Sequence, residues 1–177
     1  VYEYGSDNLI SNGGAERDLT GYWTANNGAT IDRYFYRYTG SYGMRVTGGT
    51  TPSVTSSTVS LQAGETYAIM AYVQVNSVPG GEVTMSFNNL TNSDDVPDPV
   101  TTSTSRYNTM QPFRFDFTPA SDMDVEITFE GTAGSTFYVD DVQVIEGGQW
   151  KATSNYYAFG GYYATSTSHG SQFSFSF

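Results

Sequence analysis

The chain has 177 residues, of which 7 are basic and 18 are acidic, and its formal net charge is -11. Such an acidic surface repels phosphate backbones and anionic lipids, so neither nucleic acid nor a membrane is expected as a partner. No run approaches the roughly 18 apolar residues of a membrane-spanning helix, which argues against membrane insertion. Cys is absent, which excludes disulfides and thiolate metal sites.

The abundant residues are those of an all-β protein exposed to the outside world, with 19 Gly, 15 Tyr and 11 Phe. A chain of this length can bury one sizeable core. Because it begins with Val1 rather than Met, we expect a processed piece of a longer protein.

Alternation of apolar and polar residues dominates the chain, and helical periodicity is nearly absent. Strands are predicted at residues 29–38, 43–47, 54–61, 66–75, 82–88, 111–118, 124–130 and 136–145. Turns rich in Gly and Pro separate them, and the long stretch 89–110 is predicted to be a surface loop. About eight short antiparallel strands at this spacing predict an all-β fold, a jelly-roll β-sandwich.

Several short motifs follow one another along the chain. They are Asn8-Leu-Ile-Ser-Asn-Gly-Gly-Ala-Glu16, Trp23, Gly43-Met-Arg-Val46, Leu61-Gln-Ala-Gly-Glu-Thr-Tyr67, the alternating Phe113, Phe115 and Phe117, and Phe137-Tyr-Val-Asp-Asp-Val142. In this order they resemble the calcium-containing carbohydrate-binding modules of the family 4, 9, 16 and 22 type, over about residues 8–146. The resemblance implies a jelly roll with a structural calcium ion and glycan binding, although the same sandwich also serves as a plain structural module.

The chain is predicted to divide into a sandwich domain, residues 1–146, and a β-rich C-terminal appendage, residues 147–177. The appendage begins with two glycines and is rich in Tyr and Phe. Its alternating Phe173, Phe175 and Phe177 need a partner face. The segment either packs on its own domain or adds as a strand to a neighbouring copy.

Two distant acid stretches predict a metal site if the first and last strands are neighbours. In a regular strand, Asp140 shares the apolar, inward face with Tyr138 and Val142. A buried carboxylate needs a partner, and calcium takes six to eight oxygen ligands. The candidate ligands, in a site that the resemblance also implies, are Glu16, Asp140, the carbonyls near Gly14 and Tyr42, and Asp141 as a possible helper.

Other partners for these acids remain open at this point. Asp140 can instead pair with Arg17 or Arg45, or cap backbone amides. Asp141 lies on the opposite face of a regular strand and can simply be solvated.

The candidate ligand face is the outer side of a sheet made of strands 43–47, 66–75, 82–88 and 124–130. The inner side of these strands is predicted to carry the core residues Val46, Ile69, Val73, Met85, Phe87, Ile127 and Phe129. A sugar cleft needs an aromatic platform and planar polar groups that grip hydroxyls. The candidates on this face are Tyr72, Gln74, Arg45, Ser86 and Glu126. The alternative is an ordinary solvated sheet face.

A second aromatic cluster is the strip of Tyr34, Tyr36 and Tyr38, which share one face of the predicted strand 29–38. It suits a stacking surface or a subunit interface, because Tyr is enriched at interfaces. The alternative is a strip half-buried under a loop. Trp23 is predicted to lie in the core.

Catalysis is not expected, because His169 is the one histidine and lies in the appendage, which leaves no Ser-His-Asp triad in the main domain. The sequence therefore predicts a non-catalytic glycan-binding module, located extracellularly on a cell or virion surface, with a polysaccharide or cell-surface glycan as its partner. The alternative is a structural subunit of a surface fibre, appendage or capsid decoration, in which the C-terminal segment joins neighbouring copies.

Overall fold

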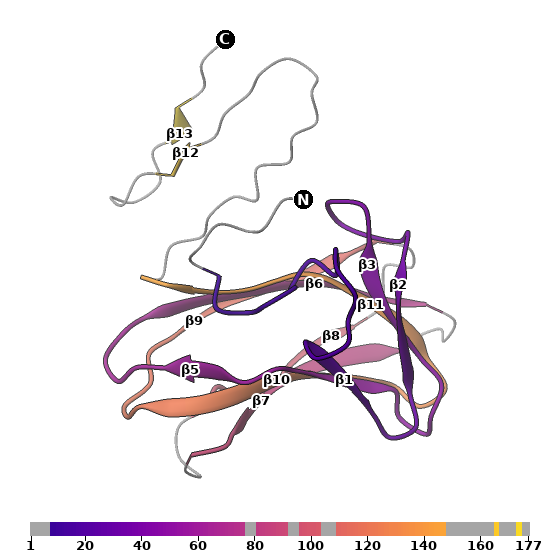
Figure 1. The fold of residues 1–177 in the computed structure, drawn as a ribbon, viewed down its shortest axis with the longest axis horizontal. Coiled ribbons are helices and arrows are strands. Elements are labelled where there is room, and N and C mark those ends of the chain that lie inside the picture. Colours follow the sequence, from indigo (N-terminus) through magenta and orange to yellow (C-terminus); the bar gives the residue numbers. More distant parts are fainter. Residues whose placement is uncertain are drawn as a thin grey trace.

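The computed structural model describes residues 8–76, 81–91, 96–103 and 109–147, together with short strands at 165–166 and 173–174. Two antiparallel sheets pack face to face and form a β-sandwich (Figure 1). The predicted all-β class is confirmed. Among the described residues, no helix is long and apolar enough to cross a membrane.

Sheet A has five strands, in the spatial order β2-β3-β11-β6-β9. Its members are β2 (Thr30–Tyr34), β3 (Gly43–Thr47), β11 (Thr136–Glu146), β6 (Tyr67–Asn76) and β9 (Gln111–Phe117). Sheet B has the order β1-β4-β10-β7-β8, with β5 also paired to β10. Its members are β1 (Trp23–Asn26), β4 (Ser53–Ser56), β10 (Met123–Gly131), β7 (Glu82–Asn89), β8 (Val100–Ser103) and β5 (Val59–Leu61).

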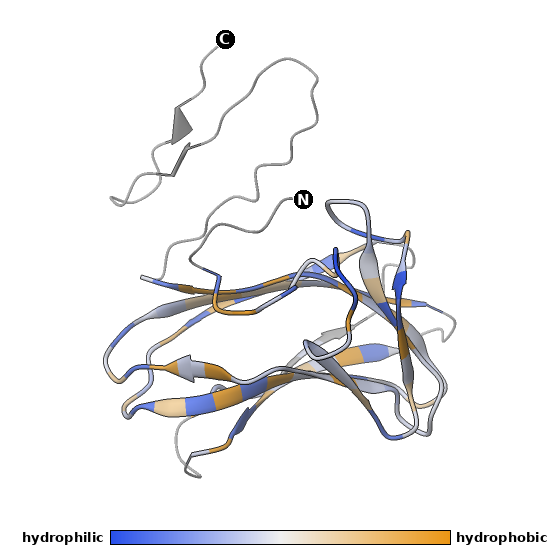
Figure 2. Cartoon of the chain, in the orientation of Figure 1, coloured by the Kyte–Doolittle hydropathy of each residue, from blue (hydrophilic) through white to orange (hydrophobic). Residues whose placement is uncertain are grey.

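Alternating side chains fill the space between the two sheets. In β10, Val125, Ile127 and Phe129 are buried, and Figure 2 shows the matching alternation of hydrophobic and hydrophilic residues along this strand. Each such side chain contributes about 1.5–3 kcal/mol through burial. Trp23 lies in the core as predicted, with its ring centroid 6.3 Å from that of Phe129.

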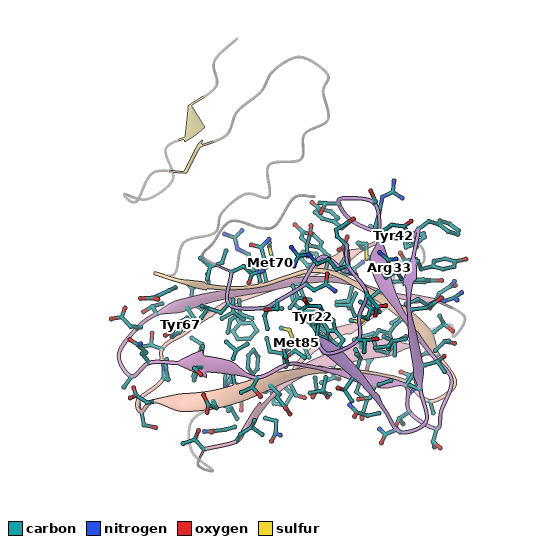
Figure 3. All side chains as sticks on the ribbon, viewed as in Figure 1. Tyr22, Arg33, Tyr42, Tyr67, Met70 and Met85 are labelled. Carbon is teal, nitrogen blue, oxygen red and sulfur yellow. The ribbon has the colours of Figure 1, made fainter. Side chains whose placement is uncertain are left out.

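The predicted inward residues are confirmed in both sheets. All of them are buried, namely Val46, Ile69, Val73, Met85, Phe87, Ile127 and Phe129. Figure 3 shows Tyr67 and Met85 between the sheets and Met70 on the outer side of sheet A.

The segment that begins at Asn8 lies along the end of β11. The Leu9 amide donates to the Val144 carbonyl at 2.9 Å, and the Val142 amide donates to the Gly13 carbonyl at 3.0 Å. The Asn8 side chain adds bonds to the same stretch of β11. The predicted contact between the first segment and the last strand of the sandwich is therefore present.

The predicted secondary structure needs correction at four places. The predicted strand 29–38 ends at Tyr34, and 54–61 is divided into β4 and β5. Strand β8 lies within the stretch predicted as a loop, and β1 was not predicted. These are short strands, of three to five residues, in which alternation gives only a weak signal.

The prediction that the four strands of the candidate ligand face belong to one sheet was wrong. Strands 43–47 and 66–75 belong to sheet A, whereas 82–88 and 124–130 belong to sheet B. Alternation identifies which residues face the core, but inward residues of both sheets meet in that core, so the pattern does not say which sheet a strand joins.

The domain boundary stays a prediction. The sandwich ends with β11 at Glu146, and residues beyond Gly147 lie outside the described part apart from β12 (Thr165–Ser166) and β13 (Phe173–Ser174), which pair antiparallel with each other.

Gly13→Ala is expected to weaken the contact between the N-terminal segment and β11. A Cβ at this position overlaps the Val142 carbonyl, so the two segments must separate. We expect the free energy of unfolding, measured by urea denaturation, to fall by about 1–3 kcal/mol. The exposed Ser11→Ala is the control, and equal stability of the two variants would contradict this account.

Candidate functional site

The outer face of sheet A carries a row of polar and aromatic side chains on adjacent strands. In register, Asp32 of β2 faces Arg45 of β3, Arg45 faces Tyr138 of β11, and Tyr138 faces Gln74 of β6. Arg45 donates to both carboxylate oxygens of Asp32, at 2.8 and 2.6 Å. This bidentate geometry fixes two planar polar groups at the edge of the face.

Five tyrosines, which we call the tyrosine face, gather beside this row. They are Tyr34, Tyr36, Tyr38, Tyr72 and Tyr138. The ring of Tyr138 lies 5.7 Å from that of Tyr34 and 5.0 Å from that of Tyr36, between ring centroids. The rings of Tyr38 and Tyr72 are stacked, with centroids 3.5 Å apart and an interplanar angle of 10°. The two aromatic clusters of the sequence are therefore one surface.

This surface has a covered layer and an exposed layer. Tyr138 is buried and Tyr72 is half-buried, whereas Tyr38 is 41% exposed and the neighbouring Phe35 is 65% exposed. Burial and the hydrogen bond with Tyr38 raise the pKa of Tyr72 to about 12. The exposed rings come from residues 35–42, a loop between β2 and β3, which we call the tyrosine loop.

Positive charge lies beside these rings. The Arg45 guanidinium lies 4.2 Å from the centroid of the Tyr34 ring, and that of Arg33 lies 4.8 Å from the centroid of Tyr42. Figure 3 shows Arg33 beside Tyr42 at the end of the sandwich where β2 and β3 meet the tyrosine loop.

The predicted ligand residues do not form one set. Arg45, Tyr72 and Gln74 belong to sheet A, but Ser86 and Glu126 belong to sheet B, on the other side of the sandwich. Gln74 is only 2% exposed. Placing all four strands in one sheet caused this error.

Sequence reasoning placed Tyr138 and Asp140 on the core face of β11, which was wrong. The core residues of this strand are Phe137, Val139, Val142 and Val144. An irregularity in the register between Asp140 and Gln143, with Asp141 at a φ of 50°, reverses the alternation. Such a bulge inserts an extra residue and re-aims the side chains around it.

The bulge carries two buried carboxylates, because Asp140 and Asp141 both have 0% exposure. The Asp140 Oδ2 atom accepts the amides of Tyr38 and Thr39, at 2.7 and 3.0 Å, and Oδ1 accepts the Asp141 amide at 2.8 Å. Asp141 accepts from the Thr39 hydroxyl, at 2.7–2.8 Å from its two oxygens. The alternative in which Asp141 is simply solvated is therefore wrong.

Burial raises the pKa of both carboxyl groups to about 7. For Asp140, three amide hydrogen bonds act in the opposite direction, and the nearby Glu16 adds to the increase. The Glu16 Oε1 atom accepts the amides of Ser41 and Tyr42, at 2.6 and 3.0 Å.

The structure thus places Glu16, Asp140 and Asp141 around the tyrosine loop. Two of these acids cap backbone amides, which was one of the open alternatives, and Arg45 pairs with Asp32 instead. Within the described ranges, no three acidic or histidine side chains are arranged to hold a metal by themselves. An ion here would also need carbonyl or water oxygens, for which the predicted Gly14 and Tyr42 carbonyls stay candidates.

The hydrogen bonding of the Asp141 carboxylate nevertheless suits a cation. One hydroxyl proton serves both oxygens of this fully buried carboxylate, and an ionised carboxylate has about four acceptor sites. A buried charge with so few donors binds a proton or a cation.

The predicted interface residues fall into two groups, one within the described residues and one outside them. Tyr34 and Tyr36 are half-buried and contact Tyr138, so they contribute to the tyrosine face. The side chains of Phe173, Phe175 and Phe177 lie outside the described residues, and their role stays a prediction.

A two-sheet sandwich is a fold that carbohydrate-binding modules share with other classes of protein, so the class is decided by the sequence. The sequence matches the CBM_4_9 family, a carbohydrate binding domain, over residues 7–136. Because this match spans more than half of the chain, the chain belongs to that family, and the matched domain is a non-catalytic carbohydrate-binding module. No curated protein matches the sequence.

Solved structures share the fold at low sequence identity. A family 16 carbohydrate-binding module is 22% identical, with a TM-score of 0.60 and coverage of 78% of this chain and 100% of that one. A xylan-binding domain of family 22 is 17% identical, with a TM-score of 0.61 and coverage of 81% and 98%. The enzymatically active domain of tailspike protein 4 of bacteriophage CBA120 is 15% identical, with a TM-score of 0.58, and the match covers 78% of this chain but 21% of that one.

In a chelating buffer, the melting temperature is expected to fall as the pH rises from 5 to 8. Both buried carboxyls have folded-state pKa values near 7, above the ordinary value of 3.8, so between these values the folded state binds more protons than the unfolded state. The free energy of unfolding therefore decreases as the pH rises through this window.

Asp141→Asn is the matched variant, because its amide does not titrate. We expect a shallower decrease of melting temperature between pH 5 and 8 in this variant, measured by scanning calorimetry. An equally steep slope in both proteins would show that Asp141 is not responsible.

Proposed function

We propose that the protein binds a polysaccharide or a cell-surface glycan on the outer face of sheet A, across the tyrosine face. The observation that carries this proposal is the convergence of five tyrosines with the bidentate Asp32–Arg45 pair on one face. The protein is expected to act outside the cell, on a cell or virion surface.

Sugar rings present apolar C–H faces and a rim of hydroxyl groups. Exposed aromatic rings such as Phe35 and Tyr38 offer flat apolar area to the former. The Asp32 carboxylate and the Arg45 guanidinium offer acceptors and donors to the latter. The net charge of -11 favours a neutral glycan over a polyanionic one.

The buried position of the paired acids supports a binding role without catalysis. Asp140 and Asp141 are closed off from solvent, so neither can meet a glycosidic bond in this conformation. Hydrolysis requires two carboxyl groups that flank the scissile bond.

A structural calcium ion is the second element of the proposal. Asp141 is its central candidate ligand, with Asp140, Glu16 and main-chain or water oxygens completing the set. When bound, the ion neutralises charge that burial otherwise disfavours, and it stabilises the junction of β11 with the tyrosine loop.

The structural role in a fibre or capsid decoration remains a second candidate function. It is favoured by the likeness of the sandwich to a segment of a phage tailspike. Deletion of residues 150–177 would abolish assembly if the C-terminal segment joins neighbouring copies, and unchanged assembly would remove the support for this role.

The glycan-binding face is tested with a panel of soluble xylan, mixed-linkage β-glucan and β-1,4-galactan. Tyr72→Ala is expected to weaken binding of the best panel member at least about tenfold, or about 1.4 kcal/mol, in isothermal titration calorimetry. Glu126→Ala, on the outer side of sheet B, is the control and should bind like the wild type. The reverse result would place the site on sheet B.

Calcium is expected to raise the melting temperature at pH 8 relative to a chelator. An ion at 100 times its dissociation constant stabilises the folded state by about 2.7 kcal/mol, which corresponds to several degrees. Asp141→Asn should remove most of this increase, and magnesium is the control ion. An unchanged wild-type melting temperature would refute the calcium site.

A further inference from the structure

We propose that Tyr38 carries the main sugar-stacking ring of the module and that Asp140 is a positioning residue that holds this ring over Tyr72. The inference rests on the glycan-binding function proposed above. It assigns to the buried acid a role in recognition that does not require a bound ion.

The first observation is the stacked pair itself. At a centroid distance of 3.5 Å and an interplanar angle of 10°, the Tyr38 ring covers one face of the Tyr72 ring. Tyr38 is 41% exposed, whereas Tyr72 is half-buried. The ring face that the stack offers to a ligand therefore belongs to Tyr38, and Tyr72 is its support.

The second observation is the attachment of the main chain at Tyr38. The Oδ2 atom of Asp140 accepts the amides of Tyr38 and Thr39, at 2.7 and 3.0 Å. Asp140 is also the register partner of Tyr72 in β6. Asp140 of β11 thus holds the backbone of Tyr38, and Tyr72, its neighbour on β6, supports the ring.

The third observation is that carboxylates accept hydrogen bonds from the tyrosine loop, in the role that the carbonyls of a neighbouring strand have in a sheet. The amides of Ser41 and Tyr42 donate to Glu16, and the Thr39 hydroxyl donates to Asp141. The Thr39 amide is buried and requires an acceptor, which Asp140 supplies, and Glu16 accepts two amides on the exposed side of the loop, so the path of the loop depends on these acids. Arg37 closes the loop on itself through the carbonyls of Gly40 and Phe35, both at 2.7 Å.

An amide side chain is a poor substitute for Asp140. Both carboxylate oxygens accept amide hydrogens, one from the tyrosine loop and the other from Asp141. Asn has a single acceptor oxygen, so Asp140→Asn loses either the loop bonds or the bond within the bulge.

The test compares Tyr38→Ala, Asp140→Asn and the double variant by calorimetric titration with the best polysaccharide of the panel. Each titration is done with calcium and with a chelator. We expect Tyr38→Ala to lose at least tenfold in affinity and Asp140→Asn at least fivefold in both buffers. The double variant should bind no more weakly than Tyr38→Ala, because Asp140 acts through that ring. Glu126→Gln, on the outer side of sheet B, is the charge-matched control and should retain full affinity.

Three results would overturn the proposal. Unchanged or tighter binding by Tyr38→Ala would make Tyr38 a cover over Tyr72 instead of the stacking ring. Losses that multiply in the double variant would give Asp140 a separate role. A loss in Asp140→Asn confined to the calcium buffer would assign it to the ion alone.

Amide hydrogen exchange measured by NMR tests the positioning role without a glycan. In Asp140→Asn, exchange at Tyr38 and Thr39 should accelerate at least tenfold, while the amides of β6 stay protected; unchanged protection at the two loop amides would refute the positioning role. If wild-type protein binds no panel member, the proposed function fails together with the ring assignment, and the exchange result still decides whether Asp140 fixes the loop.

Gly40→Ala provides a second variant if Asp140→Asn does not fold. Gly40 is exposed and has a φ of 65°, which strains an alanine, and a Cβ there overlaps the Glu16 carboxylate, so the loop conformation and the Glu16 bonds to Ser41 and Tyr42 are both disturbed. This variant should also lose affinity, with no further loss when Tyr38→Ala is added. Wild-type affinity in Gly40→Ala would contradict the dependence of the ring on the loop position.

Discussion

The candidate site depends on the bulge in β11. A regular strand would keep alternating through residues 137–145, but the extra residue at Asp141 places Asp140 on the outer side of sheet A while Val142 and Val144 stay in the core. The carboxylates then meet the amides of the tyrosine loop, and the loop in turn places its rings on the sheet. The two ends of the sandwich sequence, the N-terminal segment and β11, are joined at the same place.

The electrostatics of this arrangement follow from burial. Two adjacent carboxylates without solvent are unfavourable in their charged form, and three amides offset this for Asp140 more than a single hydroxyl does for Asp141. The two acids therefore differ in how far protein hydrogen bonds compensate their charge. Asp140 is largely satisfied by protein hydrogen bonds, whereas Asp141 is the residue that most needs a proton or a cation.

Much of the fold could be predicted from the sequence. Alternation identified inward residues such as Val46, Ile69 and Phe129, and the motif order identified the family. The alternation could not show which sheet each strand joins, so Ser86 and Glu126 were grouped with residues on the far side of the sandwich.

The site was predicted in its parts but not in its geometry. The acids and the tyrosine strip were both recognised, yet their contact depends on a bulge and on a loop whose hydrogen bonds go to side chains about 100 residues away. Strand patterning assumes regular pairing, so it continued the strand through Tyr38 and turned Tyr138 inward. Two adjacent Asp in an otherwise apolar strand were the one local sign of an irregularity.

The hydrogen bonds that anchor the tyrosine loop also bear on how such a module can change its specificity. The carboxylates of Glu16 and Asp140 hold main-chain amides, a group that every amino acid except proline possesses. The side chains at positions 35, 36 and 38 can therefore diverge without loss of the anchoring bonds. A combinatorial library confined to these positions can therefore sample new recognition surfaces while the hydrogen bonds from the main chain of the loop to Glu16 and Asp140 are kept.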